Sequence, residues 1–118
     1  MPGDEKFLRK ERLTRKREFE AVYATGRKYV GRAFICYVAR REGQGRKFGF
    51  AVSRRVGAAV VRNRVKRLLR EFYRRHRRFL AEDVQLVVVA RPASGTLRYE
   101  QCAEAMRQLL AGGEVLRG

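Results

Sequence analysis

The chain has 118 residues, with 29 lysines and arginines against 12 acidic residues, a net charge of +17 and a pI of about 11.3. This length suits a single domain that needs no disulfide or metal to hold its core. A charge excess of this size repels itself in the isolated chain, so it indicates a polyanionic partner. No apolar run is long enough to span a membrane, and the opening M-P-G-D-E-K-F has acids where a secretory signal needs bases. We therefore expect a cytoplasmic protein made of one domain, 1–118, that binds a polyanion.

The first predicted element is a short helix over 15–25. Thr14 is a suitable N-cap, and Gly26 is a suitable terminator. Phe19, Val22 and Tyr23 share one face at helical spacing. Residues 1–13 before the helix are charged and aperiodic, and we expect them to be flexible, apart from Phe7, Leu8 and Leu13, whose side chains can pack against the domain.

A strand-like region follows over 28–41. A short piece at Tyr29-Val30 is separated by Gly31-Arg32 from the run A-F-I-C-Y-V-A. In that run Phe34, Cys36 and Val38 share one face, and Ile35 and Tyr37 share the other.

The segment 42–45, E-G-Q-G, is predicted to be a hairpin loop before a strand over 47–53. One face of this strand carries Phe48, Phe50 and Val52. The opposite face carries Gly49, Ala51 and Ser53, and such small residues predict a shallow trough.

The most informative segment is A-V-V-R-N-R-V-K-R-L-L-R, within a helix predicted over 58–80. Its apolar residues fall on one arc and its basic residues on the remainder. The apolar arc holds Val61, Val65, Leu68, Leu69, Phe72 and Phe79. A face exposed only to solvent would interleave acids, whereas positions 54–78 contain eleven basic residues and the single acid Glu71. The pattern predicts a nucleic-acid-binding helix. Arg62, Arg64 and Arg67 are expected to project from its polar side. Replacing Arg64 by alanine should therefore leave the melting temperature nearly unchanged, because exposed charges contribute little to stability.

The last elements are a strand over 84–91, stopped by Pro92, and a helix over 97–110. Its inward residues are predicted to be Cys102, Ala105, Met106 and Leu109. Residues 111–118 are expected to be flexible. Cys36 and Cys102 are isolated and lie on apolar faces, which favours buried free thiols. The resulting fold class is α+β, a single-domain sandwich of a sheet and helices.

Catalytic motifs are not evident in this sequence. The only histidine, His76, lies among arginines, which favours a core-edge or phosphate-contacting role. Glu82-Asp83 is typical of a turn, and no metal-ligand, phosphate-loop or dinucleotide pattern is present. We therefore expect no catalytic residue and no metal ligand in the protein alone. Three aromatics near basic residues, Phe19, Tyr23 and Tyr37, fit either the core or stacking on single-stranded bases, and their spacing alone favours the core.

The motif V-x-R-N-R-x-K-R-L-L-R-E, preceded by F-A-V-S-R-R-V-G, resembles the protein subunit of bacterial ribonuclease P. The resemblance covers about 13–110 and includes F-E-A-V-Y, F-I-C-Y and V-V-V-A-R-P. It implies the order α-β-β-β-α-β-α with a left-handed βαβ crossover. It also implies a subunit that binds a catalytic RNA and the 5′ leader of precursor tRNA, so that the leader is removed by endonucleolytic cleavage. Magnesium, held by the RNA, is then the required cofactor.

The resemblance also assigns residues to the two RNAs. The catalytic-RNA contacts it implies are Arg62, Asn63, Arg64, Lys66, Arg67 and Arg70. The leader contacts it implies, in a cleft between the sheet and the first helix, are Phe19, Tyr23, Tyr37, Arg54, Arg55 and Arg91. Two alternatives are a ribosomal protein-like rRNA binder, which has a similar fold, and a DNA-binding regulator, although no helix-turn-helix pair precedes the basic helix.

Overall fold

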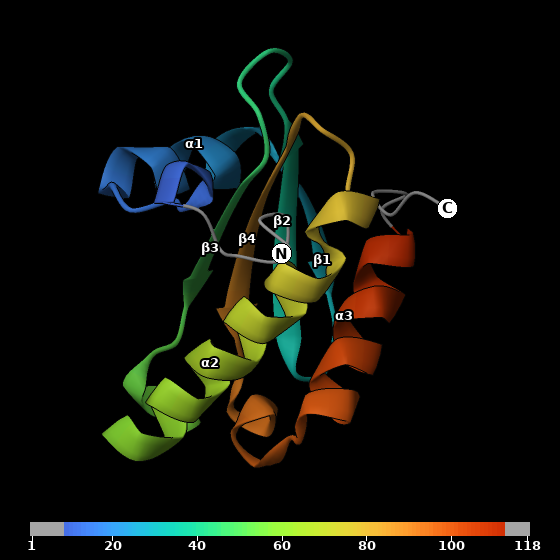
Figure 1. Cartoon of the computed structure of the whole chain (residues 1–118). Coiled ribbons are helices and arrows are strands. Elements are labelled where there is room, and N and C mark those ends of the chain that lie inside the picture. Colours follow the sequence, from blue (N-terminus) through green and yellow to red (C-terminus); the bar gives the residue numbers. More distant parts are fainter. Residues whose placement is uncertain (1–8, 113–118) are drawn as a thin grey trace.

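The computed structural model describes residues 9–112, which form one four-stranded sheet with helices on both faces (Figure 1). The strands are β1 (Arg27–Val30), β2 (Phe34–Arg40), β3 (Lys47–Ala51) and β4 (Val84–Ala90). The helices are α1 (Lys16–Thr25), α2 (Ala59–His76) and α3 (Tyr99–Gly112). The predicted α+β class and the order α-β-β-β-α-β-α are confirmed.

The sheet has the order β1-β2-β4-β3, so the last strand in sequence lies between β2 and β3. Strand β4 is antiparallel to β2 and parallel to β3. The prediction that 42–45 forms a hairpin loop is therefore wrong, because β2 and β3 are not paired. In Figure 1, β3 and β4 run downward, α2 lies on the near face, and β3 is to the left of β4. The β3-α2-β4 crossover is thus left-handed, which is rare because strand twist favours the right-handed connection.

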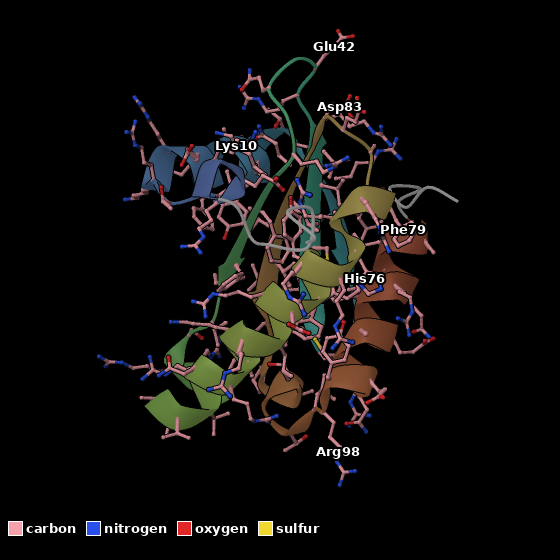
Figure 2. The ribbon with its side chains drawn as sticks, viewed as in Figure 1. Lys10, Glu42, His76, Phe79, Asp83 and Arg98 are labelled. Atoms are coloured by element: carbon pink, nitrogen blue, oxygen red, sulfur yellow. The ribbon has the colours of Figure 1, made fainter. Side chains whose placement is uncertain are left out.

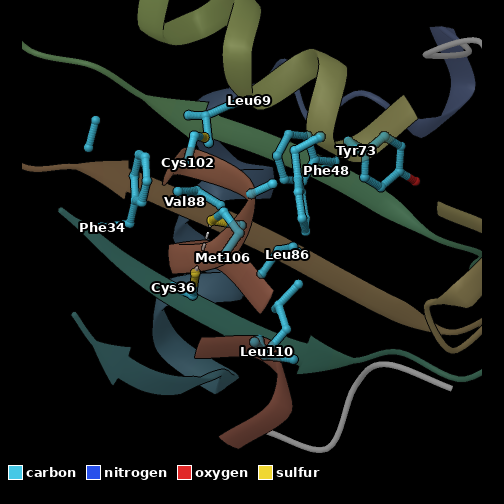
Figure 3. Close-up of a cluster of buried hydrophobic side chains, with 14 of the residues drawn as sticks. Phe34, Cys36, Phe48, Leu69, Tyr73, Leu86, Val88, Cys102, Met106 and Leu110 are labelled. Atoms are coloured by element: carbon cyan, nitrogen blue, oxygen red, sulfur yellow. Dashed lines mark hydrogen bonds between the residues drawn. The ribbon is translucent and has the colours of Figure 1, made fainter. Parts of the chain in front are cut away.

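One face of the sheet packs against α2 and α3 and forms the larger core (Figure 3). Helix α2 buries Val65, Leu69, Phe72 and Tyr73, and the Tyr73 ring stacks on Phe48 with centroids 4.6 Å apart. Of the predicted apolar arc, Val61 and Leu68 are only partly buried. Phe79 is 40% exposed, because the α-helix ends at His76 and a 3-10 turn, η4 (Arg77–Phe79), redirects its side chain.

Helix α3 begins two residues later than predicted and buries a slightly different stripe. The buried residues are Cys102, Ala103, Met106 and Leu110, whereas the predicted Ala105 and Leu109 are partly buried at its edge. The two cysteines are free and buried, as predicted. The Cys36 Sγ lies 4.0 Å from the Met106 Sδ, and burial raises the pKa of the Cys36 thiol to about 12.

The opposite face of the sheet packs against α1 over a smaller core of Leu13, Val22, Ala39 and Val87, with Phe19 at its edge. A Cβ at Gly49 would lie only 2.7 Å from the Phe19 Cζ. The trough predicted on this face of β3 is therefore filled at Gly49 by the Phe19 ring.

The start of α1 differs from the prediction. Its N-cap is Arg15 rather than Thr14. The Glu18 carboxylate reaches back and accepts hydrogen bonds from the backbone N–H groups of Thr14, at 3.0 Å, and Arg15, at 2.9 Å. These bonds are the glutamate half of a capping box, in which the side chain at the third helical position satisfies backbone N–H groups at the start of the helix. They also hold the pKa of Glu18 below its usual value, chiefly through the Arg15 N–H.

The segment that leads into α1 is packed against the sheet and α2. Glu11 is buried in the 3-10 turn η2 (Arg9–Glu11), where its carboxylate accepts hydrogen bonds from the Tyr73 hydroxyl, at 2.5 Å, and the Arg77 Nε, at 2.9 Å. The Leu13 N–H donates to the Phe48 carbonyl at 3.0 Å. The expectation of flexibility is therefore wrong for 10–12, whereas Leu13 packs as expected. It is also wrong for 111–112, which belong to α3. Residues 1–8, which include Phe7 and Leu8, and residues 113–118 lie outside the described residues.

We predict that Val65→Asp abolishes folding. Val65 is fully buried against the sheet, and an aspartate there would bury a carboxylate without a partner, at a cost on the order of 4 kcal/mol or more. Val60→Asp is the matched control on the same helix, because Val60 is 80% exposed and the first turn of α2 carries no acid. There a carboxylate complements the helix dipole and should stabilise the fold by about 0.3–1 kcal/mol. Thermal melts of both variants test this, and a folded Val65→Asp domain would contradict the packing described.

Candidate nucleic-acid interface

The outward face of α2 carries cations that point into solvent. Asn63, Arg67 and Arg70 are exposed, and Lys66 is partly exposed. The Arg70 guanidinium lies over the Phe50 ring, 5.5 Å from its centroid. Glu71 is the only acid on the helix. Its carboxylate accepts hydrogen bonds from Arg74 and Arg75, one turn further along. Four of the six residues assigned to the catalytic RNA therefore share one positively charged surface.

The other two residues of that set, Arg62 and Arg64, bond to the protein itself. The Arg62 Nε donates to the Gly57 carbonyl at 3.2 Å. The Arg64 guanidinium donates to the carbonyls of Leu97, at 2.5 Å, and Gly95. The expectation that Arg64 projects from α2 without a structural role is wrong. Nothing near Arg64 in the sequence indicates its acceptors, because they are backbone carbonyls of a distant turn.

The three aromatics lie together on the other side of the sheet, at the edge of α1. Tyr23 is 38% exposed, and its ring meets the edge of the Tyr37 ring with centroids 4.8 Å apart. The Phe19 and Tyr23 centroids are 6.5 Å apart. Lys28 places its Nζ 5.9 Å from the centre of the Tyr37 ring. The pKa of Tyr23 is raised, chiefly by its partial burial and to a smaller extent by the neighbouring Tyr37.

Next to Tyr37, a row of apolar side chains crosses the same face of the sheet. The strand register aligns Val30 with Ile35, Ile35 with Val89, and Val89 with Ala51. Val30 is exposed and the other three are partly exposed. Sequence reasoning did not single out this row, because the insertion of β4 between β2 and β3 creates it.

The remaining predicted residues lie in the turns that follow β3 and β4. Arg54 and Arg55 are exposed in the 3-10 turn η3 (Arg54–Val56), which begins where the Ser53 Oγ accepts a hydrogen bond from the Arg55 N–H. Arg91 is partly buried, and its guanidinium donates to the Gly31 carbonyl at 2.9 Å, in the β1–β2 connection. Arg91 therefore ties two connections together at the same end of the sheet.

The described residues offer no obvious site for chemistry. Between residues 9 and 112, no group of three or more histidines, cysteines and acids is placed to hold a metal ion. His76 lies on the side of α2 that faces α3, where its ring stacks on Phe72 and its Nδ1 lies 2.9 Å from the Phe72 carbonyl oxygen (Figure 2). Burial lowers the pKa of His76. Asp83 pairs with Arg40 at 3.5 Å.

Comparison with known proteins identifies the family. A family model described as Ribonuclease P matches residues 7–112. The chain belongs to the ribonuclease P protein family. The "Ribonuclease P protein component" of Desulfovibrio desulfuricans is 46% identical over 106 residues, which are 86% of this chain and 82% of that protein. The protein of the same description from Shouchella clausii is 36% identical and covers 92% of this chain and 89% of its own.

The fold agrees with this assignment. The structure of the Staphylococcus aureus RNase P protein superposes with a TM-score of 0.83 at 24% identity, covering 91% of this chain and 98% of that one. The chain is thus a protein subunit of ribonuclease P, a ribonucleoprotein endoribonuclease of tRNA processing, and its partner is the RNase P RNA. None of the helices within 9–112 is long and apolar enough to cross a membrane.

We predict that binding to RNase P RNA is strongly dependent on salt. If the cations of α2 and its flanks neutralise about 6–10 phosphates, the affinity should fall on the order of 10³–10⁵-fold between 50 and 200 mM salt, because counterions are released on binding. Titration of the RNA at four or more salt concentrations measures the slope. A nearly flat response would show that the positive charge does not contact phosphates.

Proposed function

We propose that the two faces of the sheet bind two different RNAs, and that the face beside α1 holds the single-stranded 5′ leader of precursor tRNA. The outward face of α2 contacts the RNase P RNA. The observation that carries the proposal is the contact of the exposed Tyr23 with the partly exposed Tyr37, beside an accessible apolar row on the side of the sheet opposite α2.

The α2 face suits a folded RNA. Arginines contact phosphates with a planar fork of donors, and cations along a helix can follow a phosphate backbone. Lys66, Arg67 and Arg70 supply such contacts, and Asn63 can hydrogen-bond to sugar or base edges.

The α1 side suits an unpaired strand. Bases without a pairing partner can stack on aromatic rings, and an apolar surface accepts them without regard to sequence. Tyr23 and Tyr37 offer the rings, and the row from Val30 to Ala51 extends the surface across the sheet. Lys28 lies next to Tyr37, where its charge would attract the backbone of the same strand.

The chemistry of leader removal is then assigned to the RNA and to magnesium bound by it. In this proposal the protein adds affinity for the leader and neutralises charge where two RNAs meet. The protein promotes endonucleolytic cleavage by the RNA and does not cleave precursor tRNA alone, and the reaction takes place in the cytoplasm.

We predict that Tyr23→Ala weakens binding of precursor tRNA by the assembled enzyme, with little effect on mature tRNA, which lacks the leader. Stacking contributes about 1–3 kcal/mol per base, which corresponds to a loss of roughly 5- to 150-fold. Phe79→Ala is the matched control, because Phe79 is 40% exposed, close to the 38% of Tyr23, but follows α2. It should change neither affinity.

Equilibrium titrations with both substrates, after thermal melts of each variant, test this proposal. Equal losses for precursor and mature tRNA, or an equal effect of Phe79→Ala, would return the tyrosines to a purely structural role.

A further inference from the structure

The guanidinium of Arg64 connects α2 to the turn that follows β4. It donates to two backbone carbonyls, those of Gly95 and Leu97. Gly95 lies in the 3-10 turn η5 (Pro92–Thr96), and Leu97 is the residue that ends this turn before α3. A planar guanidinium can donate to two acceptors at once, so one side chain fixes both sides of this turn.

The 3-10 turn η5 also packs closely against η3. A Cβ at Gly95 would lie 2.9 Å from the Val56 carbonyl oxygen and 3.4 Å from the Val61 Cγ1. The side chain of Ser94 is fully buried in η5. The backbones of η3 and η5 are therefore in contact, and a shift of one must move the other.

Arg62, the first arginine of the R-N-R segment, holds the end of η3. The Arg62 Nε donates to the carbonyl of Gly57, the residue that ends η3. Arg62 and Arg64 thus each fix one turn. Turn η3 carries the exposed Arg54 and Arg55, and Arg91 directly precedes η5.

We propose that Arg64, supported by Arg62, is a positioning residue that fixes η3 and η5, and so places Arg54, Arg55 and Arg91 for the leader. The consequence for the leader rests on the proposed function, whereas the clamp itself does not. Within the R-N-R segment, the two arginines face the protein and Asn63 faces solvent. The phosphate contacts of α2 come from Lys66, Arg67 and Arg70.

The experiment compares Arg64→Ala and Arg64→Lys with Arg67→Ala, an exposed arginine on the same helix. The first readout is amide hydrogen exchange of Ser94 and Leu97 in the free protein. The Ser94 N–H donates to the Arg91 carbonyl at 2.8 Å, and the Leu97 N–H donates to the Ser94 carbonyl at 3.2 Å, so both report on the turn η5. Arg64→Ala should speed this exchange roughly 10- to 150-fold through loss of charge-assisted hydrogen bonds. Arg67→Ala should leave it unchanged.

The second readout is the salt dependence of binding to RNase P RNA. Arg67→Ala should reduce the slope of log affinity against log salt by about 0.7–0.9, because one phosphate contact is lost. Arg64→Ala should leave the slope unchanged. At protein concentrations that saturate the RNA, Arg64→Ala should nevertheless lose part of the preference for precursor over mature tRNA. Arg64→Lys should restore little of it, because an ammonium does not reproduce the fork.

Three results would overturn the proposal: unchanged exchange in Arg64→Ala, a slope reduced as in Arg67→Ala, or full rescue by lysine. If Arg64→Ala does not fold, Arg64→Gln, which keeps donors for one carbonyl, is measured in its place against the same criteria. If the wild-type enzyme shows no preference for precursor tRNA, the proposed function fails, while exchange and slope still decide whether the clamp exists.

Discussion

The position of β4 in the middle of the sheet determines the rest of the structure. A strand with a neighbour on each side and helices on both faces must be apolar in both directions, and β4 reads V-Q-L-V-V-V-A. Leu86 and Val88 anchor α2 and α3, while Val87 anchors α1. Because α1 covers only part of its face, the other end of the sheet keeps an accessible apolar row. The two surfaces proposed to bind RNA therefore lie on opposite sides of the domain, with α2 and the sheet between them.

The placement of the few acids determines which part of the domain displays its net charge of +17. The buried acid Glu11 is matched by Arg77 and Tyr73, and Glu71 by Arg74 and Arg75. The acids therefore neutralise arginines near the C-terminal end of α2, and leave the cations nearer its start without a carboxylate. The partly exposed pairs of Glu71 contribute little to stability, but they determine where positive charge remains for a polyanion.

Residue patterns in the sequence predicted the features that depend on local periodicity. They missed the features that depend on contacts with backbone far away in the chain. The α2 core residues Val65, Leu69 and Phe72 follow from helical spacing, and the two faces of β2 follow from alternation. The hairpin prediction failed because β4, far along the chain, inserts between β2 and β3. The predicted apolar arc of α2 omits Tyr73, which is buried with its hydroxyl donating to Glu11 of the N-terminal segment. The role of Arg64 was missed because nothing near it in sequence identifies Gly95 and Leu97 as its acceptors.

The central claim is that the two faces bind different RNAs, and directed cleavage tests it most directly. An iron chelate that generates hydroxyl radicals is attached to a cysteine placed at Arg67 or at Tyr23. Native Cys36 and Cys102 are buried, and burial raises the pKa of both thiols, so neither competes for the label. In the complex with RNase P RNA and precursor tRNA, we expect cuts in the RNase P RNA from position 67 and cuts in the 5′ leader from position 23. Cuts in the same RNA segment from both positions, or the reverse assignment, would contradict the account.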